Sequence, residues 1–381
     1  MKAKSWAFLL CLILVGFMCR AEQSEYTSGD EYERLDESRT DYLQFYRLIG
    51  RSGCSDRGRD ICTTADGGYA VCCSTYPFGS YATRLEKYFV SGEIDYAFEI
   101  SGTGADIHFG LGELSNGHIL AAGLTSSYGA GSDDALLTHY NGSFVQWNQV
   151  IGGSSGDVFY DIAILPGDAS IAVGYTYSFG MGLRDAFVVK FLYDGSIDWV
   201  TVIGDGGSEQ LEAVVSTTDG GYLAVGNTDS AGSGAEDILV LKLDAAGNMV
   251  FARTIGKAGR DEAYAVRETA DGGYVIAGET ESDGAGAYDG LVIKCDASNA
   301  IEWAYVVGGA NEDGFSDILV HSSGEYIAVG YVYDLTPYDY LDGIISAFAS
   351  DGTYLRSSVI QDYNNQFLDA VTEAPDGKLL L

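Results

Sequence analysis

Acidic side chains recur at two fixed positions along the chain, and they are the residues most suited to chemistry. One column holds Asp106, Asp157, Glu209, Asp261 and Asp313, and the other holds Asp134, Asp185, Asp237, Asp289 and Asp342. Oxygen ligands on flexible loops suit Ca²⁺, so the calcium candidates are Asp157, Asp185, Asp237, Asp261, Asp289 and Asp313. The spacing is not that of an EF-hand loop. Carboxylates that accept backbone N–H bonds and lock turns explain the same columns, and repetition in every unit favours this structural interpretation.

No set of catalytic residues stands out from the repeats. Gly152-Gly153-Ser154-Ser155-Gly156 matches the G-x-S-x-G pattern, but that motif has meaning only between a strand and a helix. The histidines show no metal-like spacing and no cysteine joins them. We place His118 at the position of Tyr222 and His139 at that of Lys242, and we expect structural or surface roles for both, as for His108 and His321. The sequence thus predicts no catalytic residue and, Ca²⁺ apart, no cofactor.

The cysteines permit two disulfide bonds if the chain is exported. Cys62 and Cys72 flank the turn Asp66-Gly67-Gly68 and would pair directly across a hairpin with a three-residue loop. A bond between Cys54 and Cys73 is the second candidate, and it would leave Cys295 free. This connectivity stays open. Asn141-Gly142-Ser143 is a glycosylation sequon in a predicted turn, with meaning only in a eukaryotic secretory pathway.

The first 40 residues are typical of a targeting segment and a polar leader. Met1-Lys2-Ala3-Lys4 is basic, residues 8–18 are almost wholly apolar, and small side chains favour cleavage after Ala21. The apolar run is shorter than the ~20 residues that a membrane-spanning helix needs. We therefore expect a signal peptide over 1–21, with an uncleaved anchor as the alternative, and an acidic flexible leader over 22–40. The predicted location is secreted or cell-surface, without a later transmembrane segment.

Composition excludes two classes of protein. The chain has 21 Lys and Arg against 55 Asp and Glu, and its formal net charge is −34. Neutralising nucleic-acid phosphates requires Lys and Arg, so a nucleic-acid partner is excluded. Hydrophobic residues at 46% and aromatic residues at 12% exclude a wholly disordered chain.

An internal repeat of 51 or 52 residues runs along the chain. An aromatic column is followed four residues later by an Ile or Val column, and a third column is glycine, with Cys73 in the first unit. The aromatic column is Phe45, Tyr96, Trp147, Trp199, Phe251 and Trp303, with Leu355 next, and the glycine column is Gly123, Gly174, Gly226, Gly278 and Gly330. Residues an even number apart on a strand share a face. We therefore expect the Trp column to pack between units rather than to stack on sugars.

Each unit predicts four short strands. In residues 209–256, the runs 210–217, 222–226, 238–243 and 249–255 read as strands joined by turns such as Asp219-Gly220. Four strands every ~50 residues predict an all-β fold, a β-propeller of four-stranded antiparallel blades. The two acidic columns then lie on one face of the ring.

Blade counting favours seven blades over the alternative of six. Full units cover about 50–101, 102–152, 153–204, 205–256, 257–308 and 309–361, and a partial unit covers 362–381, so the propeller spans 41–381. The segment 41–49 matches the last strand of a unit and would complete the partial blade. That pairing would close the ring and leave no open sheet edge. Because a third strand is missing from that blade, we expect the printed sequence to stop about 20 residues early, or another segment to fill the place.

The repeats resemble a known family. Asp271-Gly-Gly-Tyr-Val-Ile-Ala-Gly278 with the loop ending at Asp289, and Asp219-Gly-Gly-Tyr222 with the loop ending at Asp237, are similar to the DGGY-type (SBBP-like) β-propeller repeats of secreted bacterial and archaeal proteins. The resemblance covers 41–381 and implies an extracellular propeller without a defined activity. Cys72-Cys73 in the first unit and Leu335–Asp342 in the sixth depart from the pattern.

These observations favour a non-catalytic secreted or cell-surface propeller that acts as a protein or ligand interaction module, or in adhesion. A Ca²⁺- or glycan-binding propeller is the first alternative. A polysaccharide-active enzyme on the same scaffold is the second. The expected partner is an unidentified protein or glycan.

Overall fold

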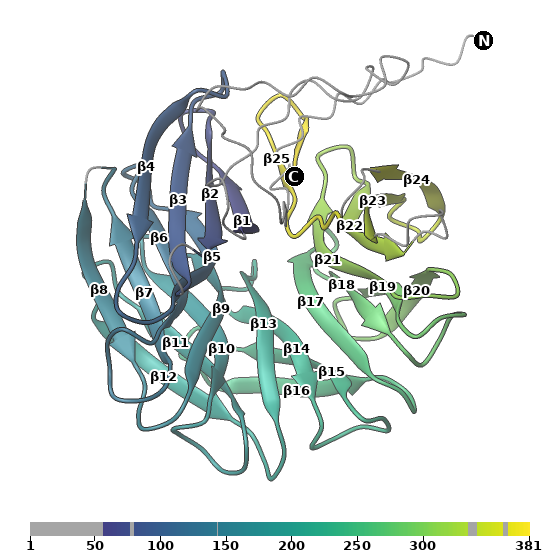
Figure 1. Ribbon diagram of the computed structural model, residues 1–381. Coiled ribbons are helices and arrows are strands. Elements are labelled where there is room, and N and C mark those ends of the chain that lie inside the picture. The colour runs from purple at the N-terminus through teal and green to yellow at the C-terminus, as the bar shows by residue number, and fades with distance from the viewer. Residues whose placement is uncertain (1–55, 77–79, 143, 334–340, 361–364) are drawn as a thin grey trace, which may run out of the picture.

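The computed structural model describes residues 56–76, 80–142, 144–333, 341–360 and 365–381. They form six four-stranded antiparallel sheets, each with its strands in chain order, arranged as blades around a common axis (Figure 1). The predicted β-propeller is confirmed. The described residues form six full blades, which is the alternative count, rather than the favoured seven. We call the strands of each blade a to d, from the axis outwards. Within the described residues, no helix is long and apolar enough to cross a bilayer.

The four strand positions have the following bounds. Strands a are β1 (Asp56–Thr63), β5 (Asp106–Glu113), β9 (Asp157–Ile164), β13 (Glu209–Ser216), β17 (Asp261–Glu268) and β21 (Asp313–Val320). Strands b are β2 (Tyr69–Thr75), β6 (Ile119–Thr125), β10 (Ser170–Thr176), β14 (Tyr222–Thr228), β18 (Tyr274–Thr280) and β22 (Tyr326–Tyr333). Strands c are β3 (Ala82–Tyr88), β7 (Asp134–Tyr140), β11 (Asp185–Phe191), β15 (Asp237–Leu243), β19 (Asp289–Cys295) and β23 (Leu341–Phe348). Strands d are β4 (Ile94–Ile100), β8 (Val145–Ile151), β12 (Ile197–Ile203), β16 (Met249–Ile255), β20 (Ile301–Val307) and β24 (Tyr354–Ile360).

The core lies between neighbouring blades. Strands b and c are buried along nearly their whole length, whereas the residues of strands d are exposed or half-buried. One cluster joins Val173 and Val188 of blade three to Leu211 and Leu241 of blade four, and comparable clusters fill the other junctions. Because both faces of each blade are covered by its neighbours, the burial of apolar area stabilises the whole ring.

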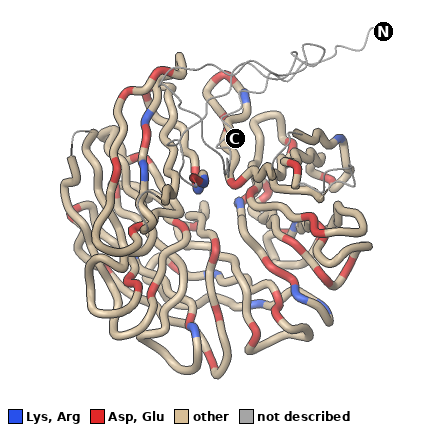
Figure 2. The backbone as a smooth tube through the Cα atoms, viewed as in Figure 1, with Lys and Arg blue, Asp and Glu red and all other residues tan. Residues whose placement is uncertain are grey.

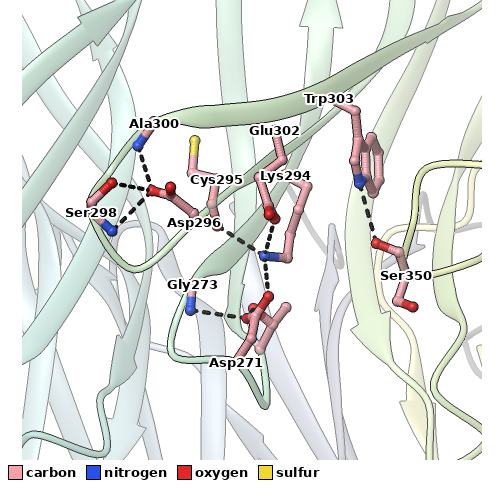
Figure 3. A network of polar contacts seen from close by, with 11 residues as sticks. Asp271, Gly273, Lys294, Cys295, Asp296, Ser298, Ala300, Glu302, Trp303 and Ser350 are labelled. Atoms are coloured by element: carbon pink, nitrogen blue, oxygen red, sulfur yellow. Dashed lines mark hydrogen bonds and ion pairs between the residues drawn. The ribbon is translucent and has the colours of Figure 1, made fainter.

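The predicted Trp column does pack between blades. Trp199 on β12 lies under the turn at Gly247 of the next blade, where an added Cβ would be 2.7 Å from the ring. Trp303 on β20 meets the next blade in the same way, and its Nε1 donates to the backbone oxygen of Ser350 at 3.3 Å (Figure 3).

A buried lysine on strand c forms two ion pairs within its own blade. Lys294 is 1% exposed, and its Nζ donates to Asp271 at 2.9 Å and to Glu302 at 2.8 Å (Figure 3). Asp271 belongs to the a–b turn and Glu302 to strand d, so the ion pairs link three parts of one blade. Lys87 repeats both contacts, whereas Lys190 pairs with Asp198 of strand d and Lys242 with Asp219 of the a–b turn.

A two-stranded hairpin follows the sixth blade, and a full seventh blade is not formed by the described residues. β25 (Thr372–Glu373) pairs with β26 (Leu379–Leu380), and the segment lies between β1 and β22 (Figure 1). Leu379 packs on blade six and Leu380 on blade one. The strand predicted over 41–49, like the signal peptide and leader predicted over 1–40, lies outside the described residues.

Every strand a carries a β-bulge at its centre. The register against strand b shifts at one residue in all six blades, and that residue has no direct partner. In blade four the extra residue is Glu212, because Leu211 pairs with Gly226 and Ala213 pairs with Val225. The bulge brings the two backbones together, and a Cβ on Gly226 would lie 2.1 Å from the Gln210 oxygen. In blades two to six the bulge therefore requires glycine at this position of strand b.

We expect Gly226→Ala to lower the free energy of unfolding by roughly 3 kcal/mol or more, because the added methyl group meets backbone that cannot move aside. Gly206→Ala is the matched control, since a Cβ there meets no atom within 4 Å. Urea unfolding followed by tryptophan fluorescence measures both variants. Equal stability of the two variants would contradict the role given to the bulge.

Candidate functional site

The six bulged residues point the most variable side chains of the repeat towards the axis of the ring. They are Arg59, Phe109, Tyr160, Glu212, Tyr264 and Ser316. All six line one cavity of about 410 Å³. The cavity also touches Glu279 and Tyr331, which lie near the ends of strands b. The site therefore opens towards the face where strands a and c begin, which we call the loop face.

Charged and aromatic side chains both line this axial channel. Basic and acidic residues gather at the centre of the ring, although the chain as a whole is acidic (Figure 2). Guanidinium groups lie over aromatic rings at distances typical of cation–π contacts. Arg59 lies 5.1 Å from the centroid of Phe109, and Arg57 lies 5.7 Å from that of Phe367. The wall of the channel can therefore offer flat apolar surface and hydrogen-bond donors side by side.

Tyrosines and glutamates form a hydrogen-bonded group on the wall of blades four to six. Tyr264 donates its hydroxyl to Glu262 and lies 3.0 Å from Glu279, and Tyr331 donates to Glu279 at 2.8 Å. Glu212, the bulged residue of the neighbouring blade, accepts a bond from Gln210 at 2.6 Å. This group combines acceptors with hydroxyl donors, which suits a ligand with several hydroxyl groups.

Three aspartates next to the bulges fasten adjacent strands a together. Asp60, Asp161 and Asp317 each accept the backbone N–H of the following residue and one N–H from the next unit. The bonds across the junctions reach Leu111, Val214 and Val371 at 2.8, 2.8 and 2.9 Å. Arg267 forms an ion pair with Asp317 at 2.9 Å. These contacts hold the bulged residues in place around the channel.

Burial raises the pKa of the channel carboxyls. It raises the pKa of Glu212 to about 8, helped by the nearby charge of Glu262. It raises the pKa of Glu279 to about 7, although the bond from Tyr331 opposes this shift. It raises the pKa of Asp161 to about 6, although the hydrogen bond from the Val214 N–H opposes this shift. Burial therefore disfavours the ionised form of these three carboxyls.

The calcium candidates lie together on the loop face, as the sequence predicts, and each is buried. Their oxygens bind backbone and hydroxyl groups: Asp157 accepts from Ser178 Oγ at 2.6 Å and Gly153 N at 2.9 Å. Asp289 accepts from Ala285 N and Gly286 N at 3.0 and 3.1 Å. Asp185, Asp237, Asp261 and Asp313 bind neighbouring backbone N–H groups in the same manner. The described part of the chain has no group of three or more His, Cys, Asp or Glu residues suited to a metal ion. Calcium binding therefore stays a prediction.

The first residue of strand a also ties neighbouring blades together in blades two to six. Asp157 N donates to Asp133 O, and Asp261 N donates to Glu236 O, both at 2.9 Å. The bond from Gln366 N to Leu341 O at 2.7 Å repeats this contact after the sixth blade. The acidic column on strands a therefore lies at the junctions between blades.

Two histidines come together although their spacing gave no sign of it. His118 Nδ1 lies 2.9 Å from His139 Nε2. The position predicted for His118 is wrong by one residue. Ile119, not His118, corresponds to Tyr222, because Ile119 pairs with Tyr140 as Tyr222 pairs with Leu243. His139 does occupy the position of Lys242.

The other two histidines also bind neighbouring groups. His108 is buried and bonds to Thr83 and Thr138 at 3.1 and 3.0 Å. The Nε2 of His321 lies 3.1 Å from the backbone oxygen of Gly377 in the hairpin. The G-x-S-x-G stretch lies in the connection between β8 and β9.

The predicted bond between Cys62 and Cys72 is wrong. The turn between β1 and β2 holds five residues rather than three, so Cys62 lies opposite Ala70 and Cys72 opposite Asp60. Cys62, Cys72, Cys73 and Cys295 are free thiols, and burial raises the pKa of each. Cys54, the partner predicted for Cys73, lies outside the described residues.

The sequon falls in a turn, as predicted. Asn141 lies between β7 and β8, and its side chain accepts the N–H of Phe144 at 3.0 Å. Ser143, the third residue of the sequon, lies outside the described residues.

Sequence reasoning missed the axial channel, although a signal was present. Strand a of each unit has one position that keeps its place in the repeat but changes its chemistry, from Arg59 and Phe109 to Glu212 and Tyr264. The aromatic, glycine and acidic columns keep similar side chains, so such variation marks a position that the scaffold does not need. The bulge was not predictable from the residues alone, because its cause is the pairing with strand b.

The fold and the channel place the chain among β-propellers, and comparisons with known proteins support the fold. No family model matches the chain. Regulatory protein FlaEY of Caulobacter vibrioides is 28% identical over 198 residues, which are 45% of this chain and 20% of FlaEY. The chain therefore spans about a fifth of the length of the curated relative that it matches.

Solved structures are similar in fold alone. Sqt1 from Chaetomium thermophilum has a TM-score of 0.51 at 13% identity, with 84% of this chain and 75% of that chain covered. A puromycin hydrolase S511A mutant complexed with PGG has a TM-score of 0.47 at 12% identity, with 86% and 51% covered.

We expect the melting temperature to fall as the pH rises from 5 to 9. The folded chain holds the protons of Glu212 and Glu279 more tightly than the unfolded chain, so their contribution is present below the ordinary Glu pKa and is lost through pH 7–8. A fall of roughly 5 °C or more is expected, because about 1 kcal/mol shifts the midpoint by about 2–4 °C in domains of 150–250 residues. Differential scanning calorimetry of wild type and the Glu212→Gln/Glu279→Gln double variant measures it.

The double variant should show a shallower fall, whereas Glu93→Gln, at an exposed turn, should match wild type. A double variant that melts with the full pH dependence would show that other groups cause it.

Proposed function

We propose that the protein is a non-catalytic recognition module, secreted or held at the cell surface, that binds a glycan in its axial channel. The observation that carries this proposal is the bulge in every strand a, which aims a different side chain into one cavity from each blade. A scaffold held by uniform contacts and a cavity lined by varied ones is the arrangement of a binding site.

The chemistry of the cavity supports a hydroxyl-rich ligand. Phe109 and Tyr160 present aromatic surface, and their ring centroids lie 5.3 Å apart. Tyr264, Glu212 and Glu279 supply donors and acceptors on the other wall. The charge of −34 suits a soluble exported protein. Export itself is supported by the predicted signal peptide.

We expect full-length protein to bind a defined set of glycans on an array, and Tyr160→Ala to weaken that binding by about tenfold or more, because the side chain lines the cavity. Tyr193→Ala is the control, since Tyr193 is exposed on the turn between β11 and β12, on the opposite face. Titration calorimetry with the strongest array ligand gives the affinities. Binding that survives Tyr160→Ala but is lost in Tyr193→Ala would place the site elsewhere.

A polysaccharide-active enzyme is the second candidate, favoured by the two carboxyls of raised pKa that line the cavity. Acid–base chemistry on glycosidic bonds uses two carboxyls, one protonated as the acid and one ionised as the base or nucleophile. If this candidate holds, new reducing ends appear when the bound glycan is incubated with protein, and Glu279→Gln abolishes their release. A glycan recovered intact after prolonged incubation would leave recognition alone.

A further inference from the structure

Arg59 differs from the other arginines of the channel. Arg57 donates to Asp369 at 3.1 and 2.8 Å, and Arg267 is paired with Asp317. Arg59, in contrast, has no carboxylate within ion-pair distance among the described residues. An unpaired guanidinium is unexpected in a chain with 55 acidic and 21 basic residues, and no ion pair among the described residues offsets the cost of desolvating it.

The side chain of Arg59 is nevertheless held in place. Its Nε donates to Ser74 Oγ at 3.1 Å, and its flat face lies 5.1 Å from the centroid of Phe109. Both contacts leave the terminal nitrogens Nη1 and Nη2 without a hydrogen bond to the described residues. A guanidinium fixed by Nε and by stacking presents the fork that binds an oxyanion through two parallel bonds.

The nearby carboxylates are engaged with other groups: Asp369 pairs with Arg57, and Asp60 accepts two backbone N–H groups. Burial and the neighbouring charge of Arg57 lower the pKa of Arg59, and the charge of Asp369 opposes this shift only in part. A ligand oxyanion would relieve both effects. The hydroxyl and carboxyl groups of Tyr264 and Glu212 line the same cavity and can bind sugar hydroxyls.

Resting on the proposed function, we propose that Arg59 receives the oxyanion of an acidic glycan, either a uronate carboxylate or a sulfate ester, through Nη1 and Nη2. The channel then distinguishes acidic from neutral sugars at this residue, although the surface of the protein is itself acidic. The net negative charge makes the discrimination stricter, because an anion can enter only where a cation is presented to it.

The test uses full-length protein on an array that carries oligouronides, their methyl esters, sulfated oligosaccharides and neutral oligosaccharides. We expect binding to an oligouronide or a sulfated probe and much weaker binding to the methyl esters. Arg59→Met should weaken binding of the acidic probe by about 10- to 100-fold, because a charge-assisted bond is lost. Arg59→Lys should recover only part of it, since an ammonium group lacks the fork.

Arg356→Met is the matched control, because Arg356 lies away from the channel and forms an ion pair with Glu325 at 2.7 Å. Thermal melting confirms that the variants fold. Preference for oligouronide over sulfated probe, or the reverse, identifies the oxyanion. Equal binding of acid and ester, with Arg59→Met unchanged and Tyr160→Ala still defective, would overturn the role of Arg59 and leave the channel as the binding site. Absence of binding to every probe would overturn both.

Discussion

The contact between a bulged strand a and a glycine on strand b governs this propeller. The bulge brings a carbonyl group of strand a so close to strand b that a side chain there would collide with it, as the position of Gly226 beside the Gln210 oxygen illustrates. The same bulge rotates one residue out of the ladder and towards the axis. One local constraint therefore creates both the repeat of the scaffold and the variable lining of the channel.

Blade one is the exception to this pairing of a bulge with a glycine. Cys73 replaces the glycine there, and the residue that it faces is Gly58, the only glycine at this position of strand a among the six blades described. The extra side chain in that blade is Arg59. The blade that departs from the repeat is thus the one that brings an unpaired positive charge to the channel.

Contacts between blades divide the acidic residues into two kinds. Asp157 and its equivalents hold turns through backbone and hydroxyl groups on the loop face, so their repetition follows from the scaffold. Asp60, Asp161 and Asp317 fasten strands a near the axis and occur in only half of the blades. Glu212 and Glu279 belong to neither kind, because they line the cavity, where burial raises the pKa of each carboxyl.

The sequence by itself determined the propeller, the four strands of each unit, the turns and the common face of the two acidic columns, because these depend on local pattern and on a period that any reader can measure. Only the tertiary structure decided which residues meet across the axis. The register of β1 against β2 separated Cys62 from Cys72, pairing across a hairpin brought His118 to His139, and closure of the ring gathered Arg59, Glu212 and Tyr264 around one cavity. Residues about 50 or more positions apart become neighbours only when blades close into a ring, and no local pattern encodes that distance.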